Sequence, residues 1–549
     1  MGFCRPLFPG FCRALGAIGG WRLALLAVLS GAEMGAAEMR ADAGAQGQDT
    51  LFIQEYRVEG TRKLPRRKIE EAVYRFLGPG RTKEDVELAR AALEQAYTTQ
   101  GFQTVAVVIP PQQVTQGVVH LQVVERAVGR LRVRGAVYSS PAKIKSMAPS
   151  LAEGRVIDFA EVPKDVIALN QLPDRQVTPS LRAGVEPDTV DVDLEVKEKA
   201  PVHASVELNN RYGPNTTPLR LNASVSDNNL GQSGNGLGLS FQTSPQNTSE
   251  VKVFSGYYLA RFVHPDWLDL MVQGTKQDSN VSTLGTTAVA GRGETAGVRA
   301  MFALPAEKDF TQSASVGADY KHFDQKVALP ASGTGAATEI VTPITYYPLS
   351  LNYGATWQGK RATTEVNVGL VFSVRGLGSD SAQFGNNRYN ADGNFLIFRG
   401  DLSHTHDLPH GLQVFGKLQG QIADQPLLSG EQASGGGVGT ARGYLEAEQV
   451  GDNSLFGTLE LRSPSLLNSI AGKKGELRVF AFTDAGWLKV NEPLPGQKNH
   501  FDFFSAGLGG SVRLLDHFEG SIIAALPLLT EGQTQANSLR ILFRGALDY

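Results

Sequence analysis

The sequence predicts a transmembrane antiparallel β-barrel of about 16 strands, preceded by two small α+β domains. From residue 201 to residue 549, apolar and polar residues alternate with the two-residue period of β-strands. The polar positions include Arg, Lys, Glu and Gln, which are costly in a dry core but ordinary in a water-filled lumen. Before residue 201, one order of strands and helices occurs twice.

Length and composition exclude several classes of protein. A chain of 549 residues is too long for one compact domain. Its net charge of −3 offers no basic face for phosphates, so no nucleic-acid partner is expected. After the extreme N-terminus, no stretch approaches the ~20 apolar residues of a membrane-spanning helix. A helical membrane protein is therefore excluded.

The first 37 residues have the pattern of a signal peptide. Basic residues occur at Arg5, Arg13 and Arg22. The apolar run 23–29 follows, and the small residues 35–37 form a cleavage site. A short membrane anchor is the alternative, but the run is too short to span. Cleavage removes both cysteines, Cys4 and Cys12, so disulfides and thiol chemistry are not expected in the mature chain.

After a short N-terminal segment, 38–50, the first small domain is predicted over 51–125. Its elements are a strand at Phe52–Val58, a helix at Lys68–Leu77, a second helix to Tyr97, and strands at Thr104–Ile109 and Val118–Val124. Gly78-Pro79-Gly80 is expected to close the first helix, and Thr82–Asp85 resembles a capping box that begins the second.

The second small domain, 126–199, repeats this β-α-α-β-β order. The predicted elements are Val128–Val133, Pro141–Met147, Pro163–Leu169, Gln176–Ala183 and Val190–Val196. Sequence identity between the two segments is slight. The shared order nevertheless favours two copies of one fold over an unrelated linker.

Residues 201–549 are expected to form the barrel. A soluble β-sandwich is the alternative, but sandwiches typically close after roughly 100 residues. In hydrocarbon, every backbone group needs an internal partner, so a closed barrel is the only β solution. Sixteen strands allow roughly 22 residues per strand and connection, although 14 or 18 strands fit nearly as well. Phe543 and Tyr549 share the apolar face of the last strand and are predicted to form the C-terminal barrel signal.

Aromatic residues in the barrel segment are expected to form girdles at the membrane interfaces rather than a ligand site. The residues concerned are Tyr257, Tyr258, Trp267, Tyr346 and Tyr347.

Two segments in the C-terminal third carry the functional prediction. The glycine-rich run 434–439 is unlike a membrane strand and predicts a long loop, which presents Arg442. In the strand-like segment 480–487, alternation places Asp484 toward the lumen. A loop folded into the barrel would allow a charge-assisted, bidentate pair between the two residues. The alternative is a solvated loop arginine and an unrelated lumenal acid.

These motifs resemble those of a known family. Ala441-Arg442-Gly443-Tyr444 resembles the Val-Arg-Gly-Tyr/Phe loop of outer-membrane barrels with periplasmic POTRA domains. Phe482-Thr-Asp484-Ala-Gly486 is similar to their Phe-x-Asp-x-Gly strand motif. The stretches 170–173, 177–179 and 184–187 look like the second POTRA domain of two-partner secretion transporters. The haemolysin secretion/activation family is the nearest resemblance.

The resemblance implies a function and its partners. The expected protein is an outer-membrane transporter that exports a large β-helical partner protein, of haemolysin or adhesin type, from the periplasm to the cell surface. The periplasmic POTRA domains (51–125 and 126–199) bind this partner, outer-membrane lipid surrounds the barrel, and the barrel assembly machinery inserts it. No enzymatic activity and no cofactor are expected, and the chain contains no GxxxxGK[ST] loop for a nucleotide.

The resemblance also assigns site residues. Arg442 of the loop pairs with Asp484 of the barrel wall, and Gly443, Tyr444, Phe482 and Gly486 support the pair. One departure is Ala441, where valine is usual. A second is the segment of about 14 residues before Phe52, which is too short for the plug helix and linker of many relatives.

Other functions are weighed against this one. An outer-membrane assembly or insertion factor of the same superfamily usually carries more POTRA domains. A barrel enzyme needs Ser/His or Asp/His groups that converge at one rim, and a passive porin lacks the N-terminal domains. His404, His406, Asp407 and His410 favour a turn after a strand at Phe395–Leu402 rather than a metal site.

Overall fold

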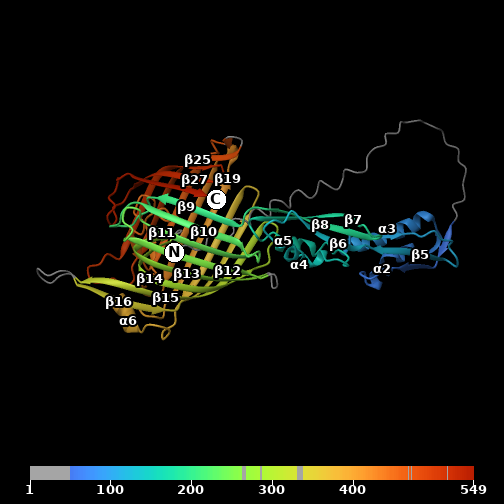
Figure 1. Ribbon diagram of the computed structural model, residues 1–549, viewed down its shortest axis with the longest axis horizontal. Coiled ribbons are helices and arrows are strands. Elements are labelled where there is room, and N and C mark those ends of the chain that lie inside the picture. Colours follow the sequence, from blue (N-terminus) through green and yellow to red (C-terminus); the bar gives the residue numbers. More distant parts are fainter. Residues whose placement is uncertain are drawn as a thin grey trace. The chain divides into compact units, whose positions relative to one another are not determined.

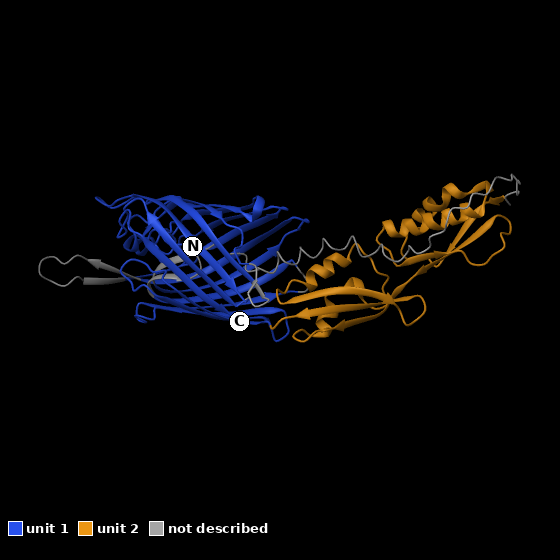
Figure 2. Ribbon diagram, turned by 90° about the horizontal axis from the view of Figure 1, so that it is seen from above, with its two compact units in different colours: residues 1–7, 201–549 blue, residues 8–200 orange. Residues whose placement is uncertain are grey.

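The computed structural model describes residues 50–262, 267–284, 287–329, 338–467, 469–470, 473–515 and 517–549. The predicted signal peptide, 1–37, and nearly all of the segment 38–50 lie outside these residues. The chain divides into two compact units, one of which holds Pro201–Tyr549 and the other the described residues up to Ala200 (Figure 2). In the described part of the chain, no helix has the length and apolarity that crossing a membrane requires.

The first small domain contains one three-stranded sheet and two main helices. In this sheet, the central β5 (Val118–Glu125) pairs in parallel with β2 (Glu55–Glu59) and antiparallel with β4 (Val105–Val108). The helices α2 (Arg66–Val73) and α3 (Lys83–Thr99) contribute Ile69, Leu93 and Tyr97 to the core, and the 3₁₀ turn η2 (Tyr74–Phe76) follows α2. The capping box is confirmed, because Asp85 N bonds Thr82 Oγ1 and Thr82 N bonds Asp85 Oδ2.

Two predictions for this domain are wrong in detail. The segment predicted as one strand is broken at Gln54 into β1 (Leu51–Ile53) and β2, because the Gln54 and Glu55 amides both turn to the Gly117 carbonyl. The segment expected only to close the first helix forms β3 (Gly78–Arg81), which pairs with β1. Positive φ angles at Gly78 and Gly80 allow this backbone path.

The second small domain has the same topology. Its central strand β8 (Thr189–Glu198) pairs in parallel with β6 (Ala127–Arg134) and antiparallel with β7 (Arg175–Ala183). The helices α4 (Pro141–Ser146) and α5 (Val162–Leu169) cover one face, and a 3₁₀ turn, η3 (Pro149–Leu151), lies between them. The repeated order in the sequence thus corresponds to a repeated sheet.

The two small domains meet at Gly101. Its carbonyl accepts a hydrogen bond of 2.9 Å from the Phe159 amide of the second domain. Gly101 has a φ of +95°, and a Cβ on it would lie 2.5 Å from the Asp158 carboxylate. Glycine is therefore required here both for the backbone conformation and for the close approach.

Residues from Val202 onward form a closed antiparallel barrel, as predicted (Figure 1). The described residues give sixteen strands, because β16 and β17 both pair with β15 and act as one interrupted strand. The strands are β9 (Val202–Asn209), β10 (Arg220–Leu230), β11 (Asn235–Thr243), β12 (Val251–Arg261), β13 (Leu268–Leu284), β14 (Thr287–Ala303), β15 (Phe310–Leu329), β16 (Thr338–Tyr346), β17 (Leu349–Gln358), β18 (Ala362–Phe372), β19 (Leu396–Asp407), β20 (Gln413–Ala423), β23 (Asn453–Arg462), β25 (Lys473–Lys489), β26 (His500–Leu514), β27 (Phe518–Pro527) and β28 (Arg540–Asp548). The two-residue β24 (Ser469–Ile470) pairs with the start of β25.

Alternation in the sequence sets which side chains face outward. On β27, Ile522 is exposed on the outer surface, whereas Ile523 is buried inside against Leu542 of β28. Tyr549 follows β28 on the outward face and is 81% exposed. Apolar side chains on the outer face and alternating inward ones are the pattern of a transmembrane barrel.

The prediction of aromatic girdles is wrong for two of its five residues. Tyr258, Trp267 and Tyr347 are exposed. Tyr346, by contrast, is fully buried, and Tyr257 shares the inward face of its strand. The error at Tyr346 arises because Tyr346 and Tyr347 are adjacent in sequence and therefore point to opposite sides of the wall.

The barrel closes where β28 pairs with β9. This ladder has five residue pairs, from Arg544–Asn209 to Asp548–Ser205, whereas β9–β10 and β27–β28 have eight each. The side chain of Asn210 extends the ladder, since its Nδ2 donates to the Ile541 carbonyl and its Oδ1 accepts from the Phe543 amide, both at 2.8 Å. We call this junction the seam.

Candidate functional site

A long loop between β20 and β23 is the centre of the site. It covers residues 424–452 and contains a small hairpin of β21 (Ala433–Gly435) and β22 (Gln449–Gly451). Gly436 and Gly437 have φ angles of +98° and +89°, which permit the chain to fold back after β21. The loop contacts inward-facing side chains from several strands, so it lies in the lumen, and we call it the lumenal loop.

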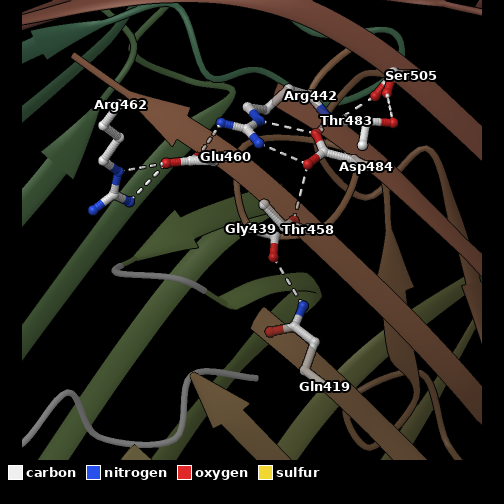
Figure 3. A network of polar contacts seen from close by, with 9 residues as sticks. All are labelled: Gln419, Gly439, Arg442, Thr458, Glu460, Arg462, Thr483, Asp484 and Ser505. Atoms are coloured by element: carbon white, nitrogen blue, oxygen red, sulfur yellow. Dashed lines mark hydrogen bonds and ion pairs between the residues drawn. The ribbon is translucent and has the colours of Figure 1, made fainter. Parts of the chain in front are cut away.

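Arg442 of the lumenal loop binds Asp484 of β25 in a bidentate pair (Figure 3). Its Nε lies 2.8 Å from Oδ2 and its Nη2 lies 2.7 Å from Oδ1, and the Arg442 amide donates to Oδ2 at 3.1 Å. Arg442 is 5% exposed and Asp484 is 1% exposed. The structure thus brings together the two residues that the sequence motifs single out.

Two further residues complete the arginine's surroundings. Its Nη1 donates to Glu460 Oε1 of β23 at 2.6 Å, and its guanidinium carbon lies 3.5 Å from the centre of the Phe482 ring. Glu460 is itself held by Arg462, which donates to Oε2 at 2.6 Å. The guanidinium therefore has two carboxylates in its plane and an aromatic face against it, an arrangement that favours arginine over lysine.

Strand register explains how these side chains meet. Thr458, Asp484 and Ser505 lie opposite one another on β23, β25 and β26, so their side chains share one inward row. Thr458 Oγ1 donates to Asp484 Oδ1 at 2.9 Å, which orients the carboxylate. Phe482 lies opposite Gly507, where a Cβ would lie 2.6 Å from the ring. That glycine allows the ring to lie flat beneath Arg442.

The other predicted residues fix the loop and the wall. The Tyr444 hydroxyl donates to the Leu529 carbonyl at 2.9 Å and lies within hydrogen-bond distance of the Phe504 backbone. Gly443 approaches the wall so closely that a Cβ would lie 2.7 Å from Pro527 N. Gly486 is covered by the Phe456 ring, to which a Cβ would come within 2.2 Å. These contacts position the loop; a role in transport stays a prediction.

Gly443→Ala should loosen the loop, because the new methyl group would push the chain away from the Pro527 backbone. We expect a loss of about 1–3 kcal/mol in the stability of the folded barrel. The temperature at which the barrel loses its compact migration in a detergent gel measures this loss. Gly416→Ala is the control, because a Cβ there meets no atom within 4 Å. Equal melting of the two variants would contradict the assignment.

A second buried ion cluster was not predicted from the sequence. Glu431, which is fully buried, binds Arg399 Nη2 at 3.2 Å, the Tyr346 hydroxyl at 3.1 Å and the Lys321 ammonium. These partners come from β19, β16 and β15. Together they anchor the part of the lumenal loop that precedes β21, which we call its first arm. Strand parity could indicate that Lys321 and Arg399 face inward, but not that they share one loop carboxylate.

Asp452 anchors the second arm of the lumenal loop, where the chain returns from β22 to the barrel wall. Its carboxylate accepts hydrogen bonds from the Leu427 amide at 2.9 Å and the Asn491 amide at 2.6 Å. Gln421 joins the two arms, because its Nε2 donates to the carbonyls of Glu431 and Asp452 at 3.1 and 3.0 Å. The base of the lumenal loop is therefore fixed independently of Arg442.

The comparisons with known proteins agree with this architecture. The family described as "POTRA domain, ShlB-type" matches residues 51–126. The family described as "Haemolysin secretion/activation protein ShlB/FhaC/HecB" matches residues 188–514, which is more than half of the chain. The chain belongs to the haemolysin secretion/activation protein family.

Individual members are distant in sequence. The outer membrane transporter CdiB of Escherichia coli is 22% identical over 471 residues, which cover 83% of this chain and 76% of CdiB. The heme/hemopexin transporter protein HuxB of Haemophilus influenzae is 20% identical over 378 residues, which cover 67% of this chain and 64% of HuxB. The solved structure of CdiB from Escherichia coli aligns with a TM-score of 0.65 at 19% identity, covers 93% of each chain and supports the fold.

Membership of the haemolysin secretion/activation protein family places the barrel in the outer membrane and the POTRA domains in the periplasm. The chain therefore enters the barrel from the periplasm at the start of β9. The connection after β9, the lumenal loop and the connection between β27 and β28 consequently lie toward the cell surface.

The prediction of a turn at His404, His406 and Asp407 is wrong. The strand β19 continues through His404 and His406 to Asp407, so these residues are in a strand rather than a turn. The turn comes later, at η4 (Pro409–Gly411). Strand length explains the error, because alternation continues past Leu402. Among the residues that the structure describes, no group of three or more His, Cys, Asp or Glu could hold a metal ion.

Proposed function

We propose that this protein exports a large secreted partner protein, of β-helical haemolysin or adhesin type, from the periplasm to the cell surface without a nucleotide. The family supports this class of function. The observation that carries the proposal is the lumenal loop, which occupies the bore and is latched to its wall through Arg442 and Asp484. A polypeptide that crosses the barrel must pass this loop.

The Arg442–Asp484 pair, which we call the latch, is suited to such passage because it is polar. Charge-assisted hydrogen bonds in a wet lumen can exchange with water or with a passing backbone, whereas an apolar plug would have to expose its surface. Folding of the partner outside the cell supplies direction, since the folded product no longer fits the bore. Outer-membrane lipid surrounds the barrel, the barrel assembly machinery inserts it, and no cofactor takes part.

We propose that the first POTRA domain captures the partner by strand addition. Both edges of the second POTRA sheet are blunted, because backbone bonds link Val128 of β6 to Gly154 and Arg155, and β7 contains Pro179. In the described residues, the sheet of the first domain ends at β2 and β4. An extended segment of the partner can add to either strand through main-chain hydrogen bonds.

The experiment first asks whether a gene beside this one encodes a large, repetitive, signal-bearing protein, and it uses that protein as cargo. Full-length transporter and cargo are produced together in a Gram-negative host, with a photo-cross-linker at Val108 of β4 or at Leu181 of β7, which are 48% and 40% exposed. We expect cargo at the cell surface and a cross-link at Val108 that exceeds the one at Leu181. Cargo that stays in the periplasm, with other outer-membrane barrels misassembled instead, would favour an assembly factor.

A further inference from the structure

The tip of the lumenal loop contacts the chain that follows the first strand of the barrel. Glu446 accepts a hydrogen bond of 3.1 Å from Arg211 Nε, and its amide donates to the Tyr212 carbonyl at 3.0 Å. Arg211 and Tyr212 follow directly on the surface end of β9. Glu446 is buried, so this ion pair is shielded from solvent.

Two residues further on, the same tip contacts the chain that leads into the last strand. Glu448 Oε1 accepts from the amides of Gln533 and Thr534 at 2.5 and 3.2 Å, and Oε2 accepts from Thr534 Oγ1 at 2.8 Å. Gln533 and Thr534 belong to the connection between β27 and β28. Glu446 therefore binds the chain next to β9, and Glu448 binds the chain that leads into β28, so the two carboxylates contact both sides of the seam.

Two glycines make room for these carboxylates. A Cβ on Gly437 would lie 2.2 Å from Glu446 Oε2, and a Cβ on Gly532 would lie 2.4 Å from Glu448 Oε1. Gly532 also has a φ of +57°. Each carboxylate thus lies against a glycine, and a larger residue in place of that glycine would displace it. Such close packing argues that the contacts of Glu446 and Glu448 are specific.

A buried cation lies at the same place. Arg540, the first residue of β28, has all three guanidinium nitrogens buried, and none has a hydrogen-bond partner within the described chain. Its guanidinium carbon lies 5.0 Å from the Tyr212 ring, and Glu446 and Glu448 supply the nearby negative charge. Removal of both acids would leave this cation uncompensated, which is costly in a buried site.

We infer that Glu446 and Glu448 form a clamp across the surface end of the seam, so that docking of the lumenal loop sets how firmly the barrel is closed. The seam ladder is shorter than the ladders on either side of it. A clamp at its end therefore adds side-chain contacts where the backbone pairing between the two strands is short. The inference does not depend on export, because it concerns the closed barrel alone.

The test is hydrogen exchange of the full-length protein in detergent or lipid. In the double variant Glu446→Gln/Glu448→Gln, we expect amides of 204–212 and 541–549 to exchange about tenfold faster, while those of β12 and β13 are unchanged. Gly532→Ala, which displaces Glu448 without a change of charge, should act in the same direction. Glu492→Gln, which removes another loop carboxylate bound to Asn390, is the control.

A disulfide distinguishes seam opening from general loosening. Leu208 and Gly545 lie opposite each other in the seam, and the only cysteines, Cys4 and Cys12, belong to the predicted signal peptide. Leu208→Cys/Gly545→Cys should suppress the faster exchange when oxidised and restore it when reduced. Unchanged seam exchange in both clamp variants, or a rise that the disulfide fails to suppress, would overturn the inference.

Discussion

Replacing Arg442 by alanine should abolish export of the partner protein while the barrel still inserts into the outer membrane. Asp484 would lose both hydrogen bonds from the guanidinium and would remain buried without a cation, and Glu460 would lose one bond but keep Arg462. Breaking a buried pair from one side costs about 3–5 kcal/mol. We expect the loop tip to leave its position. Cargo at the cell surface and heat-modifiable barrel in the membrane fraction measure the two effects.

Two variants sharpen this experiment. Arg442→Lys keeps the charge but loses the bidentate geometry, so export should fall between that of the wild type and that of alanine. Arg478→Ala removes an arginine of β25, the strand that carries Asp484; Arg478 binds Glu476 and the Ser463 carbonyl, both of which lie outside the lumenal loop. Export by that control should be near normal. Normal export by Arg442→Ala would refute the role of the latch.

Exchanging Glu431 for glutamine should release the base of the lumenal loop. Lys321 and Arg399 would then share a buried site with no carboxylate, at a cost of about 3–5 kcal/mol. We expect faster protease cleavage within 424–452 and a lower melting temperature of the barrel. Glu476→Gln, at a more exposed pair, is the control. Equal cleavage of both variants would show that the Glu431 cluster does not anchor the loop.

Alternation was sufficient to predict the barrel because it depends on local geometry alone. Each strand residue faces either lipid or lumen, and Asp484 could be placed inward by counting from its neighbours. The glycine-rich run likewise indicated a loop. The family motifs then pointed to Arg442 and Asp484, which alternation by itself could not pair.

Contacts between distant strands could not be predicted in this way. Glu431 contacts Lys321 and Arg399 because of the curvature of the barrel and the length of the loop. Local sequence patterns do not reveal either property. The clamp at Glu446 and Glu448 has the same origin. The break at Gln54 was missed because a single strand and two short strands have the same alternation.

The junction at Gly101 has a consequence for capture of the partner. The Phe159 amide bonds the Gly101 carbonyl with no room for a side chain, so any larger residue at position 101 would disturb the contact between the two POTRA domains. Under the proposed strand addition, a polypeptide bound to the first domain is held close to the second, and this contact helps to set its effective concentration there.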